Sequence, residues 1–475
     1  MMLEAVVTAS EVVFLAYFLT LHGVYLLLNA ASAINMLTSL RLYEDKALIQ
    51  VKTHLDPPIS LLVPAYNEEA TIAASVRALL QIDYPDYEIL VANDGSRDGT
   101  LDALIREFQL HPYPEAYRNR LTTQPVKAIY RSRRYRNLKV LDKANGGKAD
   151  ALNSLINIAR YPLFACVDAD SVLQRDSLSR IVLPFLTDPD TIAVGGTIRI
   201  ANGCDIRHGF LVRTGLPSNP IAVVQIVEYL RAFLFGRLGW SQFNGVLIIS
   251  GAFGLFHKET VIGVGGYRHD TLGEDMELVV RLHRVLSARG QRYRIVSVPD
   301  PVCWTEAPES LRVLYRQRTR WQRGLAESLW TNLGLLFARR SGAAGWLTFP
   351  FMLVFDLFGP ILEVLGYVFV FGAYWTGFLN LQAMLLFLAV AIGFGVLVSI
   401  FSLLIEELSF RTYRSRSDLP ILLLTAILEN FGYRQLTSVW RFWATVKWLA
   451  GRKSSWGNME RKSNNQPTEP TGSGD

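Results

Sequence analysis

Residues 60–96 read SLLVPAYNEEATIAASVRALLQIDYPDYEILVANDGS and indicate the class of fold. Residues 60–64 and 88–92 are short apolar runs, and residues 71–80 between them carry apolar side chains at helical spacing. Such an alternation is typical of a β-α-β unit in a buried sheet. It continues downstream with an apolar run at 138–141, a helical pattern at 149–158 and an apolar run at 163–167. We therefore predict an α/β fold, a sheet sandwiched between helices, over residues 57–308.

Acidic and polar side chains follow three of these apolar runs. They are Tyr66-Asn67-Glu68-Glu69, Asn93-Asp94-Gly95-Ser96 and Asp168-Ala169-Asp170. In α/β sheets, ligands bind beyond the carboxyl ends of the strands. The period of two along an extended chain aims Asp168 and Asp170 to the same side, where their oxygens can hold a hard divalent cation. Any one segment could be a helix cap or a turn, but three in succession favour a site.

Residues 271–275 (TLGED) open an amphipathic helical pattern. Thr271 and Glu274 have the spacing of a capping box, in which Thr271 caps the helix and Glu274 reaches back to it. Asp275 is not needed for that cap. We therefore expect Asp275 to be the carboxylate free to act as general base towards an acceptor hydroxyl.

Gln317, Arg320, Trp321 and Gly324 are spaced so that they share one face of a helix. On that face, Arg320 could bind diphosphate oxygens and Trp321 could offer a flat ring to a sugar. The alternative is a basic amphipathic helix on anionic lipid, because further arginines stand at positions 312, 316, 318 and 323. We expect both interpretations to hold, on different faces of the helix.

The composition indicates that the chain combines a globular part with a membrane part. Of the 475 residues, 50% are hydrophobic and 19% charged, and the mean hydropathy is +0.21. This is too apolar for a soluble enzyme and too charged for a membrane bundle, so we expect a globular domain plus a membrane region. A net charge of +6 and the basic cluster at residues 131–136 do not indicate a nucleic-acid partner. The three cysteines, an odd number at wide spacing, exclude a disulfide framework and a zinc site of the CxxC type.

Two long uncharged stretches predict membrane helices. Residues 12–37 suffice for one span, and residues 364–405 suffice for two spans joined near residues 376–380. The first basic residues of the chain follow the first stretch, which places the N-terminus outside and the next segment in the cytoplasm. We expect a multi-pass protein of the plasma (inner) membrane with its catalytic domain in the cytoplasm.

Three segments near the C-terminal end differ from plain spans. Residues 346–362 are apolar but carry Asp356 and a Gly-Pro break, which predicts a membrane-surface helix leading into the second span. The short apolar run at 419–428 precedes a break near residues 430–432, which favours a re-entrant or tilted element, although a fourth full span stays open. The polar residues 463–475 are expected to be disordered.

Six motifs, in order along the chain, carry a resemblance to a known family. They are PAYNEE (64–69), NDGS (93–96), NGGKAD (145–150), DAD (168–170), GED (273–275) and QRTRW (317–321). With membrane helices behind them, they resemble the motifs of membrane-embedded processive family 2 glycosyltransferases, the group of cellulose, hyaluronan, chitin and poly-N-acetylglucosamine synthases. The resemblance covers roughly residues 57–462, most of the chain.

The resemblance implies a GT-A domain inserted between an N-terminal transmembrane helix and a C-terminal α-helical membrane region with interfacial helices. The expected parts are an N-terminal helix and linker (1–56), the cytoplasmic GT-A domain (57–307), the interfacial helix with QRTRW (308–345), the membrane region (346–450) and a tail (451–475). The implied reaction is an inverting, metal-dependent transfer from a nucleotide sugar, UDP-glucose or UDP-N-acetylglucosamine. The acceptor would be a growing β-linked polysaccharide that is extruded across the membrane.

The resemblance also implies which residues bind the donor. Tyr66 would stack on the base, and Glu68 and Asp94 would contact the nucleoside. Lys148 and Asp168 would lie along the diphosphate.

Further along the chain, the resemblance implies the metal site and the catalytic residues. Asp168 and Asp170 would hold Mg²⁺ or Mn²⁺, and Asp275 would be the base. Gln317 and Arg320 would line the diphosphate and acceptor site.

Two more roles follow from the resemblance. Trp321 would stack on the acceptor sugar at the entrance of a membrane channel. Arg461, in the looser motif WGNMER at 456–461, would close over the nucleotide. If only three full spans exist, that channel could require a second protomer or an accessory membrane protein.

Other functions remain open at this stage. The alternative to a polymer synthase is a single-sugar transferase acting on a membrane lipid, because some lipid glucosyltransferases share a motif like QRTRW. A receptor or inactive relative that carries the same domain also stays open. A transporter is disfavoured because the two halves show no repeated hydropathy.

Overall fold

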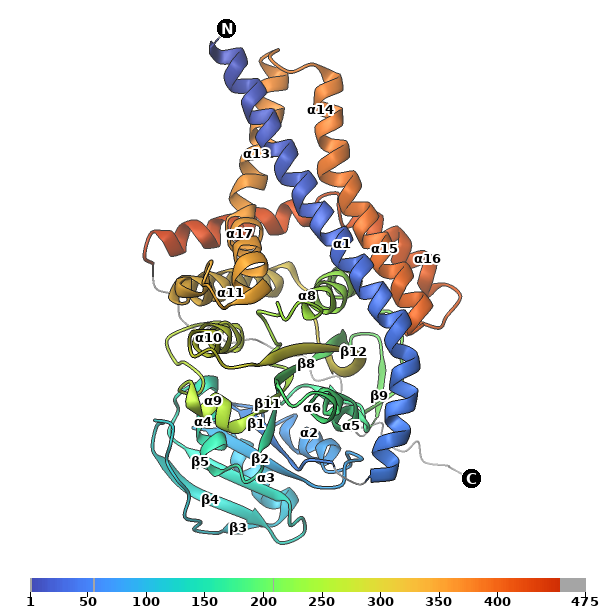
Figure 1. Cartoon of the computed structure of the whole chain (residues 1–475). Helices are drawn as coiled ribbons and strands as arrows, with labels where there is room; N and C mark the ends of the chain where they lie inside the picture. The colour runs from blue at the N-terminus through green and yellow to red at the C-terminus, as the bar shows by residue number, and fades with distance from the viewer. Residues whose placement is uncertain (1, 54–55, 208, 453–475) are drawn as a thin grey trace.

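The computed structural model describes residues 2–53, 56–207 and 209–452. Arg461, its segment 456–461 and the tail 463–475 lie outside these residues. In the described part, a globular domain built on a sheet lies at one end, and long helices project from its other end (Figure 1). The N-terminal end of α1 (Met2–Thr53) is far from the sheet.

A mixed sheet of ten strands forms the centre of the described globular domain. In spatial order its strands are β3 (Leu110–Pro112), β4 (Val126–Ser132), β5 (Leu138–Lys143), β2 (Tyr87–Asp94), β1 (Ile59–Ala65), β6 (Leu163–Val167), β11 (Phe253–His257), β8 (Thr191–Ile200), β12 (Arg294–Thr305) and β7 (Val172–Leu173). Strands β5, β2, β1 and β6 run parallel, whereas β11 is antiparallel to both of its neighbours. A small separate sheet pairs β9 (Asp205–Arg207) with β10 (Phe210–Arg213). The expected α/β fold is confirmed.

Helices cover both faces of this sheet. Leu61 and Val63 of β1 belong to one buried cluster, and Leu62 between them belongs to another. The helices on the first side are α2 (Ile72–Leu79), α3 (Thr100–Phe108), α5 (Ser177–Ile181) and α7 (Pro220–Tyr229). Those on the second side are α4 (Lys148–Ile158), α9 (Lys258–Gly263) and α10 (Glu274–Ala288). Burial on two sides explains why the strands are continuous apolar runs.

A layer of helices separates the sheet from the long helices (Figure 1). It consists of η1 (Leu230–Gly236), α8 (Arg237–Ser241), α11 (Leu311–Thr331), η2 (Leu333–Leu335), η3 (Ala344–Thr348), α12 (Phe349–Phe351) and η4 (Met352–Leu357). Helix α10 packs against α11, and α11 in turn packs against α17 (Tyr433–Leu449). The start of α10 is thereby connected through α11 to the C-terminal helices.

Two helices in the described residues are long and apolar enough to cross a membrane. They are Ala9–Ile34 within α1, and Leu381–Ser409, which comprises α14 (Leu381–Leu388), η5 (Ala389–Gly393) and α15 (Phe394–Ser409). The pair Ala344–Leu357 and Gly359–Trp375 (α13) is bent by 45° and would add a third span if it crosses as one unit. The turn expected near residues 376–380 lies between α13 and α14.

The short helix α16 (Asp418–Leu428) and α17 are separated by the break expected near residues 430–432. Gly432 has φ 93°, a left-handed conformation that glycine adopts without strain. Helix α17 runs across α13 rather than along it (Figure 1). Within the described residues, neither α16 nor α17 qualifies as a full span by length and composition.

Candidate active site

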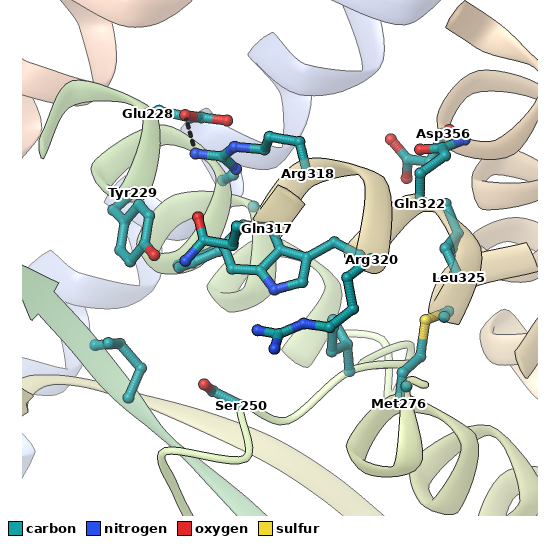
Figure 2. A pocket seen from close by; sticks show the side chains of 18 of the residues that line it. Glu228, Tyr229, Ser250, Met276, Gln317, Arg318, Arg320, Gln322, Leu325 and Asp356 are labelled. Atoms are coloured by element: carbon teal, nitrogen blue, oxygen red, sulfur yellow. Dashed lines mark hydrogen bonds and ion pairs between the residues drawn. The ribbon is translucent and has the colours of Figure 1, made fainter. Parts of the chain in front are cut away.

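A cavity of about 890 Å³ lies between the sheet and the long helices. Asp168 and Asp170, which follow β6, line it together with the first turn of α10 and one face of α11. Figure 2 shows Arg320 reaching from α11 towards the loop that carries Ser250. The predicted acidic strand end and the predicted helix face therefore meet in one space.

Lys148 lies between the acidic groups of this cavity. Its Nζ atom is 2.5 Å from Oδ1 of Asp168 and 4.0 Å from Oε1 of Glu274. Burial lowers the pKa of Lys148, but Asp168, Glu274 and Asp275 outweigh that effect and hold the pKa above its ordinary value. Lys148 is the first residue of α4, after the left-handed Gly147. The ammonium group is therefore charged and fixed beside the acidic strand end.

The Asp168-Ala169-Asp170 segment is a turn after β6 and not the extended segment expected, because the N–H of Ser171 donates to the backbone oxygen of Asp168 at 3.0 Å. Both carboxylates line the cavity, whereas Ala169 is buried in the core cluster on one face of the sheet. In the part of the chain that the structure describes, no three His, Cys, Asp or Glu side chains form a metal-binding group. Two carboxylates open to a cavity still match Mg²⁺ and Mn²⁺ chemistry, because such ions take one or two carboxylates plus substrate phosphates and waters.

Asp275 is held by the backbone in the first turn of α10. The N–H group of Gly251 donates to Oδ2 at 2.9 Å, and that of Met276 donates to Oδ1 at 2.8 Å. The carboxylate also lines the cavity. Asp275 is thus oriented by groups that leave acceptor capacity on both oxygens for a substrate hydroxyl.

The predicted capping box is wrong. Helix α10 begins at Glu274 with Gly273 as its N-cap, and no side chain caps it. Thr271 instead accepts a hydrogen bond from the N–H of Gly273 at 3.2 Å. Glu274 lines the cavity, where burial raises its pKa to about 7 despite the opposing effect of Lys148. Glu274 therefore lies beside Lys148, 4.0 Å from its Nζ atom, instead of reaching back to Thr271.

The face of α11 predicted from its spacing is present. Gln317, Arg320, Trp321 and Gly324 all line the cavity. The Trp321 ring packs near Phe233, with ring centres 5.9 Å apart. Oε1 of Gln317 is buried without a hydrogen-bond partner within the described residues.

Of the four arginines in the lipid-facing interpretation, two are exposed and two pair with carboxylates. Arg312 and Arg316 are exposed. Arg318 is buried and donates to Glu228 at 2.7 Å, and Arg323 donates to Glu327 at 2.7 Å. Glu327 is an i,i+4 partner on the same helix that the spacing could have shown, whereas Glu228 comes from α7 and only the fold supplies it.

Asp94 lies in a buried network at the end of β2. It accepts from Lys143 Nζ at 2.5 Å, from the N–H of Gly146 at 3.0 Å and from the N–H of Gly147 at 2.7 Å. These contacts hold the loop that presents Lys148 to the cavity. A nucleoside contact by Asp94 stays a prediction.

Tyr66 and Glu68 follow β1, the neighbour of both β2 and β6. Tyr66 is half exposed, and Oε2 of Glu68 accepts from the Thr71 hydroxyl at 2.8 Å. These two residues and Asp94 share the carboxyl edge of the sheet with Asp168 but do not line the 890 Å³ cavity. Their contacts with a nucleoside stay predictions.

Arg237 is a cavity residue that the sequence interpretation missed. It is only 8% exposed, and its guanidinium stacks on Phe233 at 4.4 Å. Among the described residues, none forms a hydrogen bond or ion pair with its guanidinium. The sequence did carry a signal for Arg237, because the apolar stretch LRAFLFGRLGW (230–240) contains two arginines. Burying a charge without a partner costs free energy, so a charged residue in an apolar segment is a candidate for a functional site.

The cavity continues among the long helices, where it is lined by polar groups. They include Tyr25 of α1, Asp356 of η4, Glu363 of α13, and Arg434 and Arg441 of α17. Arg441 donates to Oε1 of Gln322 at 2.7 Å and to the backbone oxygen of Asp356 at 2.6 Å. The space beside Asp275 is therefore continuous with a polar space between apolar helices.

Comparison with known proteins identifies the family. Residues 57–324 match the family described as "Glycosyltransferase like family 2". The chain belongs to this family. It is a glycosyltransferase with a GT-A-like mixed sheet, as the motifs led us to expect.

The relatives of this glycosyltransferase include poly-beta-1,6-N-acetyl-D-glucosamine synthases. The one from Staphylococcus epidermidis is 29% identical over 282 residues, which are 58% of this chain and 57% of that protein. The one from Staphylococcus aureus strain COL is 32% identical over 274 residues, 57% of this chain and 55% of that protein. The chain thus matches little more than half the length of these curated relatives.

Among solved structures, the mannosyltransferase PcManGT from Pyrobaculum calidifontis, in complex with GDP-Man and Mn²⁺, aligns with 91% of this chain and 100% of its own. The sequence identity is 20% and the TM-score is 0.47.

Proposed function

We propose that this glycosyltransferase adds sugars from a nucleotide sugar to a growing polysaccharide and passes the product between its long helices. The observation that carries the proposal is the cavity that runs from Asp168 and Asp275 to Glu363 and Arg441. A polar space between apolar helices suits a chain of hydroxyl-rich sugars, which needs hydrogen-bond partners at membrane depth.

The donor is proposed to be UDP-N-acetylglucosamine or UDP-glucose. The names of the poly-N-acetylglucosamine synthases support the first of these, because their product is built from that sugar. Lys148 and Arg320 supply the positive charge that a diphosphate requires, and Gln317 adds an amide. Tyr66, Glu68 and Asp94 are proposed to contact the nucleoside at the neighbouring strand ends.

Asp168 and Asp170 would hold Mg²⁺ or Mn²⁺, an ion that neutralises charge on a diphosphate leaving group. The fit rests on two carboxylates that line one cavity and on the hard oxygen ligands that they present. Asp168 also positions the ammonium of Lys148, which would lie beside the donor diphosphate.

Asp275 is proposed to take the proton from the acceptor hydroxyl while that oxygen attacks the sugar in a single inverting displacement. The N–H of Gly251 keeps the carboxylate oriented. Trp321 would hold the acceptor ring in line, and Arg320 would stabilise the leaving diphosphate. We propose that the catalytic domain is cytoplasmic and that the N-terminus lies outside, since nucleotide sugars are supplied from the cytoplasm. A second copy or an accessory membrane protein stays a prediction.

The decisive experiment incubates membranes that contain the protein with UDP- and GDP-sugars. Nucleotide release and product size are measured together, with Asp275→Asn as the inactive control. A polymer formed from one UDP-sugar supports the proposal. A single sugar on an extractable lipid would show the alternative, a lipid glycosyltransferase. Equal nucleotide release by Asp275→Asn and the wild type would refute the assignment of Asp275 and its cavity as the active site.

A further inference from the structure

One face of the Trp321 ring is already covered. The guanidinium carbon of Arg318 lies 4.6 Å from the centre of that ring. Arg318 is 6% exposed, so bulk water does not compete for this position. Because an aromatic ring has two faces, an acceptor sugar can stack only on the opposite face.

Glu228 determines where Arg318 lies. Its Oε2 atom accepts from Nη2 of Arg318 at 2.7 Å (Figure 2). The same atom accepts from the hydroxyl of Tyr433 at 3.0 Å. Glu228 belongs to α7, Arg318 and Trp321 belong to α11, and Tyr433 opens α17. All four residues line the cavity.

Arg318 cannot hold this position by stacking alone. A guanidinium over an indole contributes less than a buried charge costs without a counter-ion. The carboxylate of Glu228 supplies that counter-ion and holds Nη2 of the guanidinium. Movement of Glu228 would therefore reposition Arg318 and, through it, the Trp321 ring.

We propose that Glu228 is a positioning residue of the acceptor site, which acts by holding Arg318 against one face of Trp321 and leaves the other face for the acceptor sugar. This inference rests on the proposed function. Glu228 also connects Trp321 to the start of α17, because Tyr433 donates to the same carboxylate oxygen that Arg318 contacts.

A second arginine that pairs with a glutamate and lies near an aromatic ring provides the control for Glu228, Arg318 and Trp321. Arg199 of β8 pairs with Glu406 of α15 at 3.1 Å and lies 5.6 Å from the ring centre of Phe410. Arg199 and Glu406 are at least as buried as Arg318 and Glu228. None of the three control residues lines the cavity.

The test compares the variants Glu228→Gln, Arg318→Lys and Glu406→Gln in detergent-solubilised full-length protein. For each, transfer to polymer and hydrolysis of UDP-N-acetylglucosamine are measured, and the ratio of transfer to hydrolysis is formed. We expect Glu228→Gln to lower this ratio by at least about tenfold and to shorten the product. Arg318→Lys should do the same, because an ammonium keeps the charge but cannot stack as a plane.

Glu406→Gln should leave the ratio unchanged, whatever it does to protein yield. Equal ratios in Glu228→Gln and Glu406→Gln would overturn the inference. A wild-type ratio in Arg318→Lys would also overturn it, even if Glu228→Gln failed to fold. If the wild-type protein itself transferred no sugar, the proposed function would fail instead, so the two failures are distinguishable.

Discussion

Gly273 and Gly324 meet backbone to backbone where the start of α10 packs on α11. A Cβ atom on Gly324 would lie 2.9 Å from both N and Cα of Gly273. Gly273 precedes the proposed base Asp275 by two residues, and Gly324 follows Trp321, the residue proposed to stack on the acceptor sugar, by three. Two glycines thus determine how closely the base and the platform approach.

We predict that Gly324→Ala lowers sugar transfer by about 10²-fold, because a methyl group at this contact pushes α10 away from α11. Transfer rates of purified protein would measure the effect. Gly334→Ala is the control, since its added Cβ would meet an ordinary contact 3.6 Å away. Equal activity of the two variants would contradict the prediction.

Asp275→Asn should lower the rate of sugar transfer by roughly 10² to 10⁴-fold or more, because an amide cannot accept the proton of the acceptor hydroxyl. Binding of UDP-N-acetylglucosamine, followed by calorimetry, should persist. The amide oxygen of Asn can still accept from Gly251, so the loop remains in place. Turnover near the wild-type rate would remove Asp275 from the role of base.

Removal of divalent metal should stop transfer, and Mg²⁺ or Mn²⁺ should restore it. Asp170→Ala should not be rescued at ordinary metal concentrations, because the site would lose one of its two carboxylates. Nucleotide release measured against metal concentration tests both statements. Metal-independent transfer would refute the assignment of Asp168 and Asp170.

Trp321→Ala should shorten the polymer and reduce transfer more than it reduces donor hydrolysis, because the indole holds the acceptor and not the leaving group. Trp330→Ala is the control on the same helix, since Trp330 is 56% exposed and packs only on Trp448 among aromatic rings of the described residues. A parallel loss of transfer and hydrolysis in Trp321→Ala would indicate a purely structural role.

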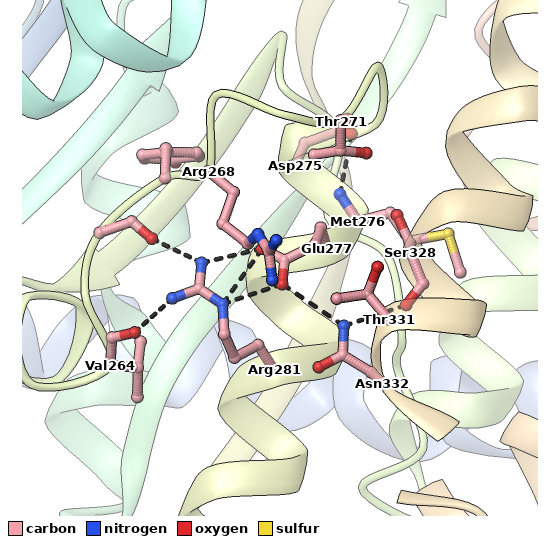
Figure 3. A network of polar contacts seen from close by, with 12 residues as sticks. Val264, Arg268, Thr271, Asp275, Met276, Glu277, Arg281, Ser328, Thr331 and Asn332 are labelled. Carbon is pink, nitrogen blue, oxygen red and sulfur yellow. Dashed lines mark hydrogen bonds and ion pairs between the residues drawn. The ribbon is translucent and has the colours of Figure 1, made fainter. Parts of the chain in front are cut away.

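Arg281→Met should lower the free energy of unfolding by about 3 to 5 kcal/mol, because it leaves the buried Glu277 without its charge partner. Arg281 pairs with Glu277 at 2.8 Å and donates to the backbone oxygens of Val264 and Gly266 (Figure 3). Unfolding in detergent would measure the loss.

The exposed Arg77, paired with Glu107, supplies the control. Arg77→Met should cost less than about 1 kcal/mol, because solvent screens this surface pair. Similar losses of unfolding free energy in Arg77→Met and Arg281→Met would contradict the prediction that the buried pair of Arg281 and Glu277 stabilises the fold more than a surface pair does.

The sequence alone determined features that depend on short-range periodicity. The helical spacing of Gln317, Arg320 and Trp321 placed these three side chains on one face of α11. Continuous apolar runs predicted strands that are buried on both sides. These features are local because the backbone geometry of a strand or a helix dictates them.

Only the tertiary structure decided which groups these residues meet. Glu274 pairs with Lys148 of α4 rather than capping its own helix, and Arg318 turns inward to Glu228 rather than to lipid. Glu228 and Tyr433 share a hydrogen bond although 205 residues separate them. A buried polar side chain pairs with a group that compensates the free energy lost when water is removed from it. In these cases folding brings that group from a distant element, so local spacing cannot identify it.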